Sequence, residues 1–188
     1  MTEPTTGADV VHELTTDHRE ATTLLDELLA TGNPETRRDM ADIVITELVR
    51  HSVAEEMYVY PAMREHLPDG DQAVAHDIEE HKELERMMKE LEACDADDPR
   101  FTSLVSELRE KLHHHATDEE NEQFPQLRAR LPHDKLVKMR KQVQTAKKIA
   151  PTRPHPNAPN SEVFHKMVGP GVGLMDRVRD KLTGRTTP

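Results

Sequence analysis

The stretch His51–Pro61 reads H-S-V-A-E-E-M-Y-V-Y-P, and it returns as H-A-T-D-E-E-N-E-Q-F-P at His115–Pro125. Sixty-four positions separate the two copies, so the histidine, one glutamate and the final proline recur in register. A further histidine precedes each copy, His18 in the first and His81 in the second. The chain therefore contains a duplicated unit, H…H-x-x-x-E, and each unit is long enough for two helices.

The composition limits what the chain can be. Its 188 residues suit one domain with an appendage, and aromatic residues make up only 3%. A formal net charge of −11 argues against nucleic acid or an anionic membrane as the main partner, because both require a positive face. No apolar run approaches the roughly 20 residues that span a bilayer, and the N-terminus lacks a signal-peptide pattern. Cys94 is the single cysteine, so we expect no internal disulfide and a cytoplasmic location.

Apolar residues recur at steps of three and four along four stretches, at about residues 9–28, 36–58, 74–91 and 101–122. Short turns rich in glycine, proline and aspartate separate them, which favours antiparallel neighbours. We therefore predict an all-α fold, an antiparallel up-down-up-down four-helix bundle with extra C-terminal helices. Pro61 is expected to kink or stop the second helix.

The remaining chain divides at residue 150. Residues 1–8 are expected to be disordered, and 9–150 to form the bundle plus a fifth helix at 133–149, basic on its outer side. Residues 151–188 are predicted to be a proline-rich linker and a short amphipathic helix. The apolar residues Leu174, Met175, Val178 and Leu182 could dock that helix on the bundle or on a second subunit.

Polar side chains occupy the predicted inner faces near one level of the bundle. Residues four apart lie nearly above one another on a helix, so each H-x-x-x-E pair projects to one side. Six buried imidazoles and carboxylates are untenable without cations, and two divalent or trivalent ions would satisfy them. None of these positions is a thiolate, so the set suits iron, with manganese or zinc as substitutes. The predicted metal ligands are His18, His51, Glu55, His81, His115 and Glu119.

This doubled pattern resembles the hemerythrin-like (HHE cation-binding) family over about residues 9–132. The resemblance implies a non-haem di-iron centre with an oxo or hydroxo bridge and with Glu55 and Glu119 as bridging carboxylates. It also implies small-molecule chemistry, namely O₂ binding or sensing, iron sensing, or reactions with peroxide or nitric oxide.

The sequence departs from the oxygen carriers of that family, which place two histidines four apart on the third helix. Asp77 and Glu85 stand at the two positions where a fifth histidine would be expected. Tyr58 lies seven residues after His51 and about 20° from its direction, which makes it our candidate for an additional iron ligand. Glu122 is a second candidate, as a ligand or as an acid that contacts one. The histidines expected to face water are His76, His113 and His114.

Four histidines and an anionic oxygen ligand oppose the di-ferrous state that reversible O₂ carriage requires. We therefore predict a possible di-iron, catalase-like oxidoreductase that consumes H₂O₂ in oxidative stress or iron homeostasis. The alternative is a carrier or sensor that binds O₂, NO or iron without turnover. The expected partners are these small molecules, with no nucleic acid and no membrane, and the expected assembly is a monomer or weak homodimer.

Overall fold

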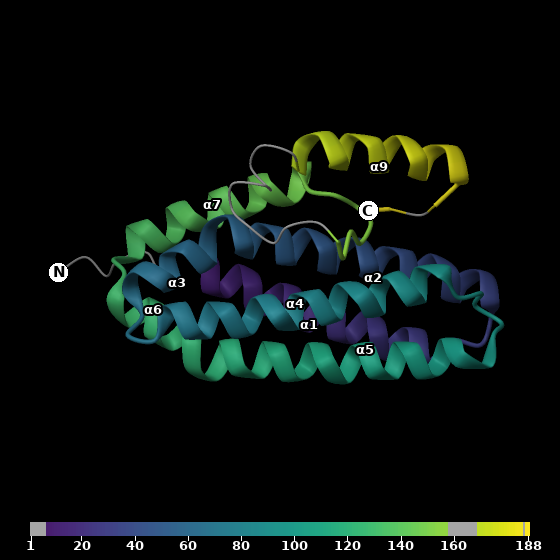
Figure 1. Cartoon of the computed structure of the whole chain (residues 1–188), viewed down its shortest axis with the longest axis horizontal. Coiled ribbons are helices and arrows are strands. Elements are labelled where there is room, and N and C mark those ends of the chain that lie inside the picture. The colour runs from purple at the N-terminus through teal and green to yellow at the C-terminus, as the bar shows by residue number, and fades with distance from the viewer. Residues whose placement is uncertain (1–6, 158–168, 186) are drawn as a thin grey trace.

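The fold is a bundle of four long helical segments, seen in a computed structural model that describes residues 7–157, 169–185 and 187–188. The four segments contain the helices α1 (Val10–Ala30), α2 (Pro34–Ala54), α4 (Gly70–Ala93) and α5 (Pro99–Asp118), in that order. Helix α1 packs against α2 and α5, and α4 packs against α5 and α2, which closes an antiparallel ring (Figure 1). The predicted all-α four-helix bundle is confirmed, and the described residues contain no strand.

Local sequence sets the helix ends. Asp9, Asn33 and Asp98 each accept a hydrogen bond from a backbone N–H in the first turn of the helix that follows, as N-cap residues do. Prolines at the start of α2 and α5 lack only an N–H that would have no partner there. The observed bounds agree closely with the four predicted stretches.

Each copy of the repeated motif contains a π-helical turn that was not predicted. Glu55–Val59 joins α2 to α3 (Tyr60–His66), and Glu119–Gln123 joins α5 to α6 (Phe124–Arg130). Pro61 and Pro125 follow these turns. A proline has no backbone N–H to donate to the carbonyl four residues earlier, and in a regular α-helix its ring clashes with that carbonyl. The wider turn accommodates the proline, so the helical chain continues through Pro61 into α3 and through Pro125 into α6, and the stop that we allowed for at Pro61 does not occur.

The apolar core is divided by the level at which the histidines lie. One cluster surrounds Tyr60, Met63 and Phe124, and the other surrounds Leu25, Ile45 and Phe101. Helix α7 (His133–Ile149), the predicted fifth helix, lies over α1 and α2. No helix among the described residues is long and apolar enough to cross a membrane.

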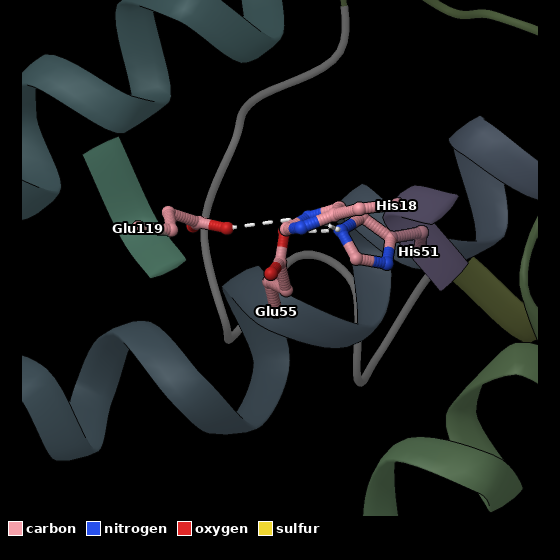
Figure 2. A group of neighbouring side chains, drawn as sticks. All are labelled: His18, His51, Glu55 and Glu119. Carbon is pink, nitrogen blue, oxygen red and sulfur yellow. Dashed lines mark hydrogen bonds and ion pairs between the residues drawn. The ribbon is translucent and has the colours of Figure 1, made fainter. Parts of the chain in front are cut away.

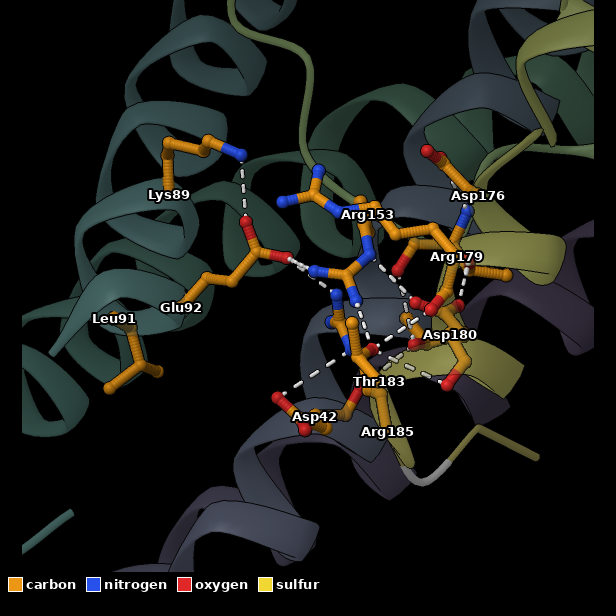
Figure 3. Close-up of polar contacts among 12 residues, drawn as sticks. Asp42, Lys89, Leu91, Glu92, Arg153, Asp176, Arg179, Asp180, Thr183 and Arg185 are labelled. Atoms are coloured by element: carbon orange, nitrogen blue, oxygen red, sulfur yellow. Dashed lines mark hydrogen bonds and ion pairs between the residues drawn. The ribbon is translucent and has the colours of Figure 1, made fainter. Parts of the chain in front are cut away.

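The C-terminal segment packs on the bundle through polar groups. Thr152 and Arg153 are buried directly after α7, where we predicted an extended linker. Helix α9 (Gly169–Thr183) turns Asp176 and Asp180 inward, and Asp180 accepts hydrogen bonds from the side chains of Thr152 (2.6 Å) and Arg153 (2.7 Å) (Figure 3). The apolar strip does not dock on the bundle, since its members Leu174, Met175, Val178 and Leu182 are 52–82% exposed. Docking on a second subunit stays a prediction.

Further ion pairs between side chains connect this segment to α2 and α4. Glu92 on α4 accepts hydrogen bonds from Arg153 at 2.7 Å and from Arg185, and Arg185 also lies 3.5 Å from Asp42 on α2 (Figure 3). Residues 1–6 of the N-terminal stretch predicted to be disordered, and residues 158–168 of the predicted linker, lie outside the described residues.

We expect Arg153→Met to release the C-terminal segment. The change leaves Glu92 and Asp180 buried with fewer partners, which should lower the free energy of unfolding by about 3 kcal/mol. Thermal unfolding and the rate of proteolysis after residue 157 measure the effect. Lys181→Met, which removes an exposed cation from α9, should change neither the stability nor the proteolysis rate. Equal stability of the two variants would contradict the assigned role of Arg153.

Candidate metal centre

The structure brings together all six predicted metal ligands. His18 comes from α1, His81 from α4, and the two H-x-x-x-E pairs from the junctions of α2 and α5 with their π-helical turns. Each is at most 3% exposed. Figure 2 shows His18, His51, Glu55 and Glu119 converging, with His51 and Glu55 on one continuous helical segment.

The imidazoles form two pairs. The Nε2 atoms of His18 and His51 lie 3.0 Å apart, and those of His81 and His115 lie 3.2 Å apart. We call the positions beside these pairs subsite 1 and subsite 2, respectively.

Two carboxylates lie across both subsites. Glu55 Oε2 is 3.1 Å from Nε2 of His51 and 3.4 Å from Nε2 of His81. Glu119 places one oxygen 3.4 Å from Nε2 of His18 and the other 3.7 Å from Nε2 of His115. The arrangement therefore offers two adjacent cation positions, each with two imidazoles and a share of two carboxylates.

A second ring of carboxylates orients the imidazoles. Each Nδ1–H donates a hydrogen bond to one carboxylate: His18 to Glu120 (2.9 Å), His51 to Asp17 (3.1 Å), His81 to Glu56 (2.9 Å) and His115 to Glu80 (3.0 Å). A carboxylate behind the imidazole fixes its tautomer and raises its basicity as a metal ligand.

Sequence reasoning missed these four carboxylates, although they carry a signal. Asp17 and Glu80 directly precede the first histidine of each unit, and Glu56 and Glu120 directly follow the glutamate of each motif. The outer ring is thus duplicated in the same register as the ligands.

The donor set fits cations. With each Nδ1 donating outward, the Nε2 lone pairs of a histidine pair face each other across about 3 Å. No aligned donor among the described residues serves either oxygen of Glu55 or Oε2 of Glu119, and both carboxylates are fully buried. Buried acceptors without donors are costly, and a cation at each subsite removes that cost.

Without cations, protons occupy the same positions. Burial opposes the charged form of His51, but the negative charge of Glu55 and the hydrogen bond to Asp17 raise its pKa to about 9. The pKa of His81 is likewise raised to about 10 against burial, by the nearby carboxylate of Glu55 and by the hydrogen bond to Glu56. Burial lowers the pKa of His18, and that of His115 to about 4. In the absence of metal, His51 of the first pair and His81 of the second therefore carry the positive charge, while His18 and His115 stay neutral.

The phenol at the centre belongs to Tyr60 and not to Tyr58. Tyr60 Oη lies 2.9 Å from Nε2 of His81 and donates to Glu119 at 3.4 Å. The π-helical turn explains the difference, because the backbone N–H of Tyr60 bonds to the carbonyl of Glu55 five residues earlier and so places Tyr60 one turn above Glu55. Tyr58 is half-buried against the apolar cluster. The prediction of Tyr58 as a ligand assumed a regular α-helix, and the structure places Tyr60 beside His81 instead.

The other candidate oxygens divide by position. Glu122 is exposed, since the second π-helical turn rotates it away from the centre. Glu85 points toward the C-terminal segment, where it accepts from the backbone N–H of His155 at 3.5 Å. Asp77 is fully buried and accepts a hydrogen bond from Gln123 at 3.0 Å, so it is the only one of the three that lies close to the ligands.

The two subsites differ where the duplicated halves differ. Phe124, the counterpart of Tyr60, stacks on His18 with ring centroids 6.1 Å apart, so subsite 1 has an apolar ring where subsite 2 has a phenol. A cleft of about 70 Å³ between α1 and α2 also reaches His18 and His51. Ala21 lines this cleft, whereas its counterpart in the second half is the larger, buried Leu84.

Comparison with known proteins gives consistent results. Residues 9–127 match the hemerythrin HHE cation binding domain family. An uncharacterized hemerythrin-like protein of Schizosaccharomyces pombe is 29% identical over 167 residues, covering 88% of this chain and 82% of the relative. A DNA nickase of Nostoc sp. is 25% identical over 131 residues, and the match covers 70% of this chain but only 37% of that protein.

A solved structure has the same fold. The hemerythrin HHE cation-binding-domain protein from Mycobacterium kansasii superposes with a TM-score of 0.66, covering 90% of this chain and 99% of its own, at 17% identity.

We expect Glu55→Ala to lose metal from both subsites, because this carboxylate lies between them. The remaining buried ligands would then lack a partner, which should lower the free energy of unfolding by about 3–5 kcal/mol. Metal analysis per chain and thermal unfolding measure the two effects. Glu122→Ala removes an exposed carboxylate of the same chemistry and should retain both metals. Two ions per chain in Glu55→Ala would refute the bridging assignment.

Proposed function

We propose that this chain, which belongs to the hemerythrin HHE cation-binding family, holds two iron ions and consumes hydrogen peroxide in catalase fashion. The observation that carries the proposal is the Tyr60 phenol beside His81 and Glu119, in a centre with four histidines. An anionic oxygen ligand stabilises the ferric state electrostatically, and it opposes the di-ferrous state that a reversible oxygen carrier needs.

The donor set supports iron. A set of four imidazoles and two carboxylates suits iron, and the one thiol of the chain, Cys94, lies in the apolar cluster away from the ligands. When bound, two irons supply a two-electron reservoir, so that one peroxide is oxidised to O₂ with loss of two protons and a second is reduced to two waters. Asp17, Glu56, Glu80 and Glu120 hold the imidazole Nδ1 protons in place while the charge of the centre changes.

The asymmetry of the subsites supports a reactant position at subsite 1. Subsite 2 has Tyr60 as an additional oxygen donor, while Phe124 leaves subsite 1 without one. The cleft beside His18 and His51 has a volume of about 70 Å³, room for a molecule of a few heavy atoms, since a water molecule takes up about 30 Å³ in the liquid. Hydrogen peroxide meets that size limit, as do O₂ and NO.

The alternative function is a carrier or sensor that binds O₂, NO or iron without turnover. The C-terminal segment favours it, because the ion pairs of Arg153 and Arg185 couple this segment to α2 and α4, which both supply metal ligands. Nickase activity is not proposed, because the match covers about a third of that relative and this chain carries a net charge of −11.

We expect the iron-loaded protein to rest in the di-ferric state and to evolve O₂ from hydrogen peroxide. It should show a phenolate-to-iron absorption band that Tyr60→Phe abolishes, with O₂ evolution falling roughly tenfold or more, about 1.4 kcal/mol in the barrier. Absorption spectra and an oxygen electrode measure the two effects. Tyr58→Phe is the matched control and should change neither. A stable di-ferrous protein that takes up and releases O₂ would refute the peroxide function and favour the carrier.

We expect Ala21→Leu to slow the reaction with peroxide while leaving the iron content and the absorption spectrum unchanged. Leucine at this position reproduces Leu84 of the second half and fills the cleft, while every ligand side chain stays in place. Stopped-flow rates with peroxide measure the effect, and Leu24→Ala, which enlarges the cleft, should not slow the reaction. An unchanged rate in Ala21→Leu would show that the reactant arrives by another path.

A further inference from the structure

Two more pairs of metal-ligating residues lie outside the buried centre. His76 and Glu80 lie four apart on α4, and His114 and Asp118 lie four apart on α5. Each pair therefore projects from one side of its helix, and the two helices pack against each other. Both buried ligand motifs are H-x-x-x-E. The exposed pairs have the same spacing, as H-x-x-x-E at His76 and H-x-x-x-D at His114.

The four side chains are linked in pairs, and each pair includes Glu80 or His114. Glu80 Oε1 lies 3.2 Å from Nδ1 of His114 and 3.8 Å from Nε2 of His76. Nδ1 of His114 lies 3.6 Å from Oδ2 of Asp118. The histidines are 56% and 61% exposed, whereas Glu80 is only 3% exposed. Solvent therefore reaches the imidazoles directly while the shared carboxylate is held in place.

The corresponding face of the first half has different residues and is covered by another helix. The counterparts of the four residues are Glu13, Asp17, Arg50 and Ala54. Helix α7 covers that face, where Lys147 lies 2.6 Å from Asp17 and Arg140 lies 2.7 Å from Glu13. On the second half the corresponding carboxylate faces two histidines instead of a covering helix.

Lys111 is a fixed cation at the group. Its Nζ lies 3.2 Å from Glu80 Oε1, but it approaches Glu83 more closely, at 2.7 Å. A small rotation leaves Lys111 with Glu83 and opens Glu80 Oε1 to another cation. His76 and Asp118 also line a surface cavity of about 300 Å³, which gives room for a hydrated ion.

We propose that His76, Glu80, His114 and Asp118 bind a further divalent transition-metal ion, such as Zn²⁺ or Fe²⁺, at the surface. Two imidazoles and two carboxylates match the preferences of these ions, and water completes the coordination. The proposal does not depend on which metals fill the buried centre.

The surface site communicates with the buried centre through one carboxylate. Glu80 Oε2 accepts the Nδ1 proton of His115, and Oε1 belongs to the surface group. An ion on Oε1 draws charge from the carboxylate and weakens its hydrogen bond to His115, and the coupling is reciprocal. The site thus holds an ion beside a ligand of subsite 2.

Zn²⁺ titration of the metal-loaded protein tests the proposal, with iron and zinc counted after dialysis. We expect one zinc per chain above the ions already held, with the iron count unchanged. His76→Ala combined with His114→Ala should weaken zinc binding at least about tenfold, while His113→Ala, which removes an exposed neighbouring histidine, should not. Zinc that replaces iron one for one, or equal zinc binding by the double variant, would overturn the site.

A second variant separates coordination from nonspecific attraction. Lys111→Met removes the cation that competes for Glu80, so zinc should bind several-fold more tightly. All substituted side chains are exposed or half-exposed, and thermal unfolding checks that each variant retains its fold. An affinity unchanged by Lys111→Met would contradict coordination by Glu80. Failure of the surface site leaves the iron count untouched, so it is distinguishable from a failure of the buried centre.

Discussion

The rest of the structure depends on one electrostatic constraint: six polar ligands converge where the bundle excludes water. Two buried carboxylates and four imidazoles require positive charge, and the chain meets that need only when cations or protons lie between them. The four carboxylates behind the imidazoles strengthen the constraint, since they turn every Nε2 lone pair inward. The apolar clusters on either side then hold the helices at the spacing that the ligands need.

Much of this centre is predictable from sequence because its ligands share the helical period and a duplicated register. The outer carboxylates were missed for a physical reason. A charged residue beside a ligand, such as Glu56 or Glu80, lies about 100° round the helix and is normally assigned to solvent. In a bundle that direction points at the neighbouring helix, and there it meets the imidazole of the other chain segment. Only the recurrence of the acid in both units could have indicated the pairing.

The placement of Tyr58 and the docking of the C-terminal helix on the bundle differ from expectation because local rules changed with context. A residue's direction on a helix follows from counting only while every turn is α-helical, and the π-helical turns at the two prolines break that count. In α9 the apolar strip suggested the docking face, yet buried ion pairs of Arg153 and Arg185 hold the opposite face. Sequence periodicity identifies two faces of such a helix, but it cannot say which one finds partners on the bundle.

The differences between the two halves carry more functional information than their similarity. Duplication alone would give two equivalent subsites, and equivalent subsites have no reason to divide the work of a reaction. Here Tyr60 against Phe124 gives one subsite the phenol, and Ala21 against Leu84 gives the other the cleft. The aromatic difference acts across the two halves, because Tyr60 contacts His81 and Phe124 stacks on His18, whereas Ala21 lines a cleft at the histidines of its own half. A centre built this way can hold charge at one ion while it admits a reactant at its neighbour.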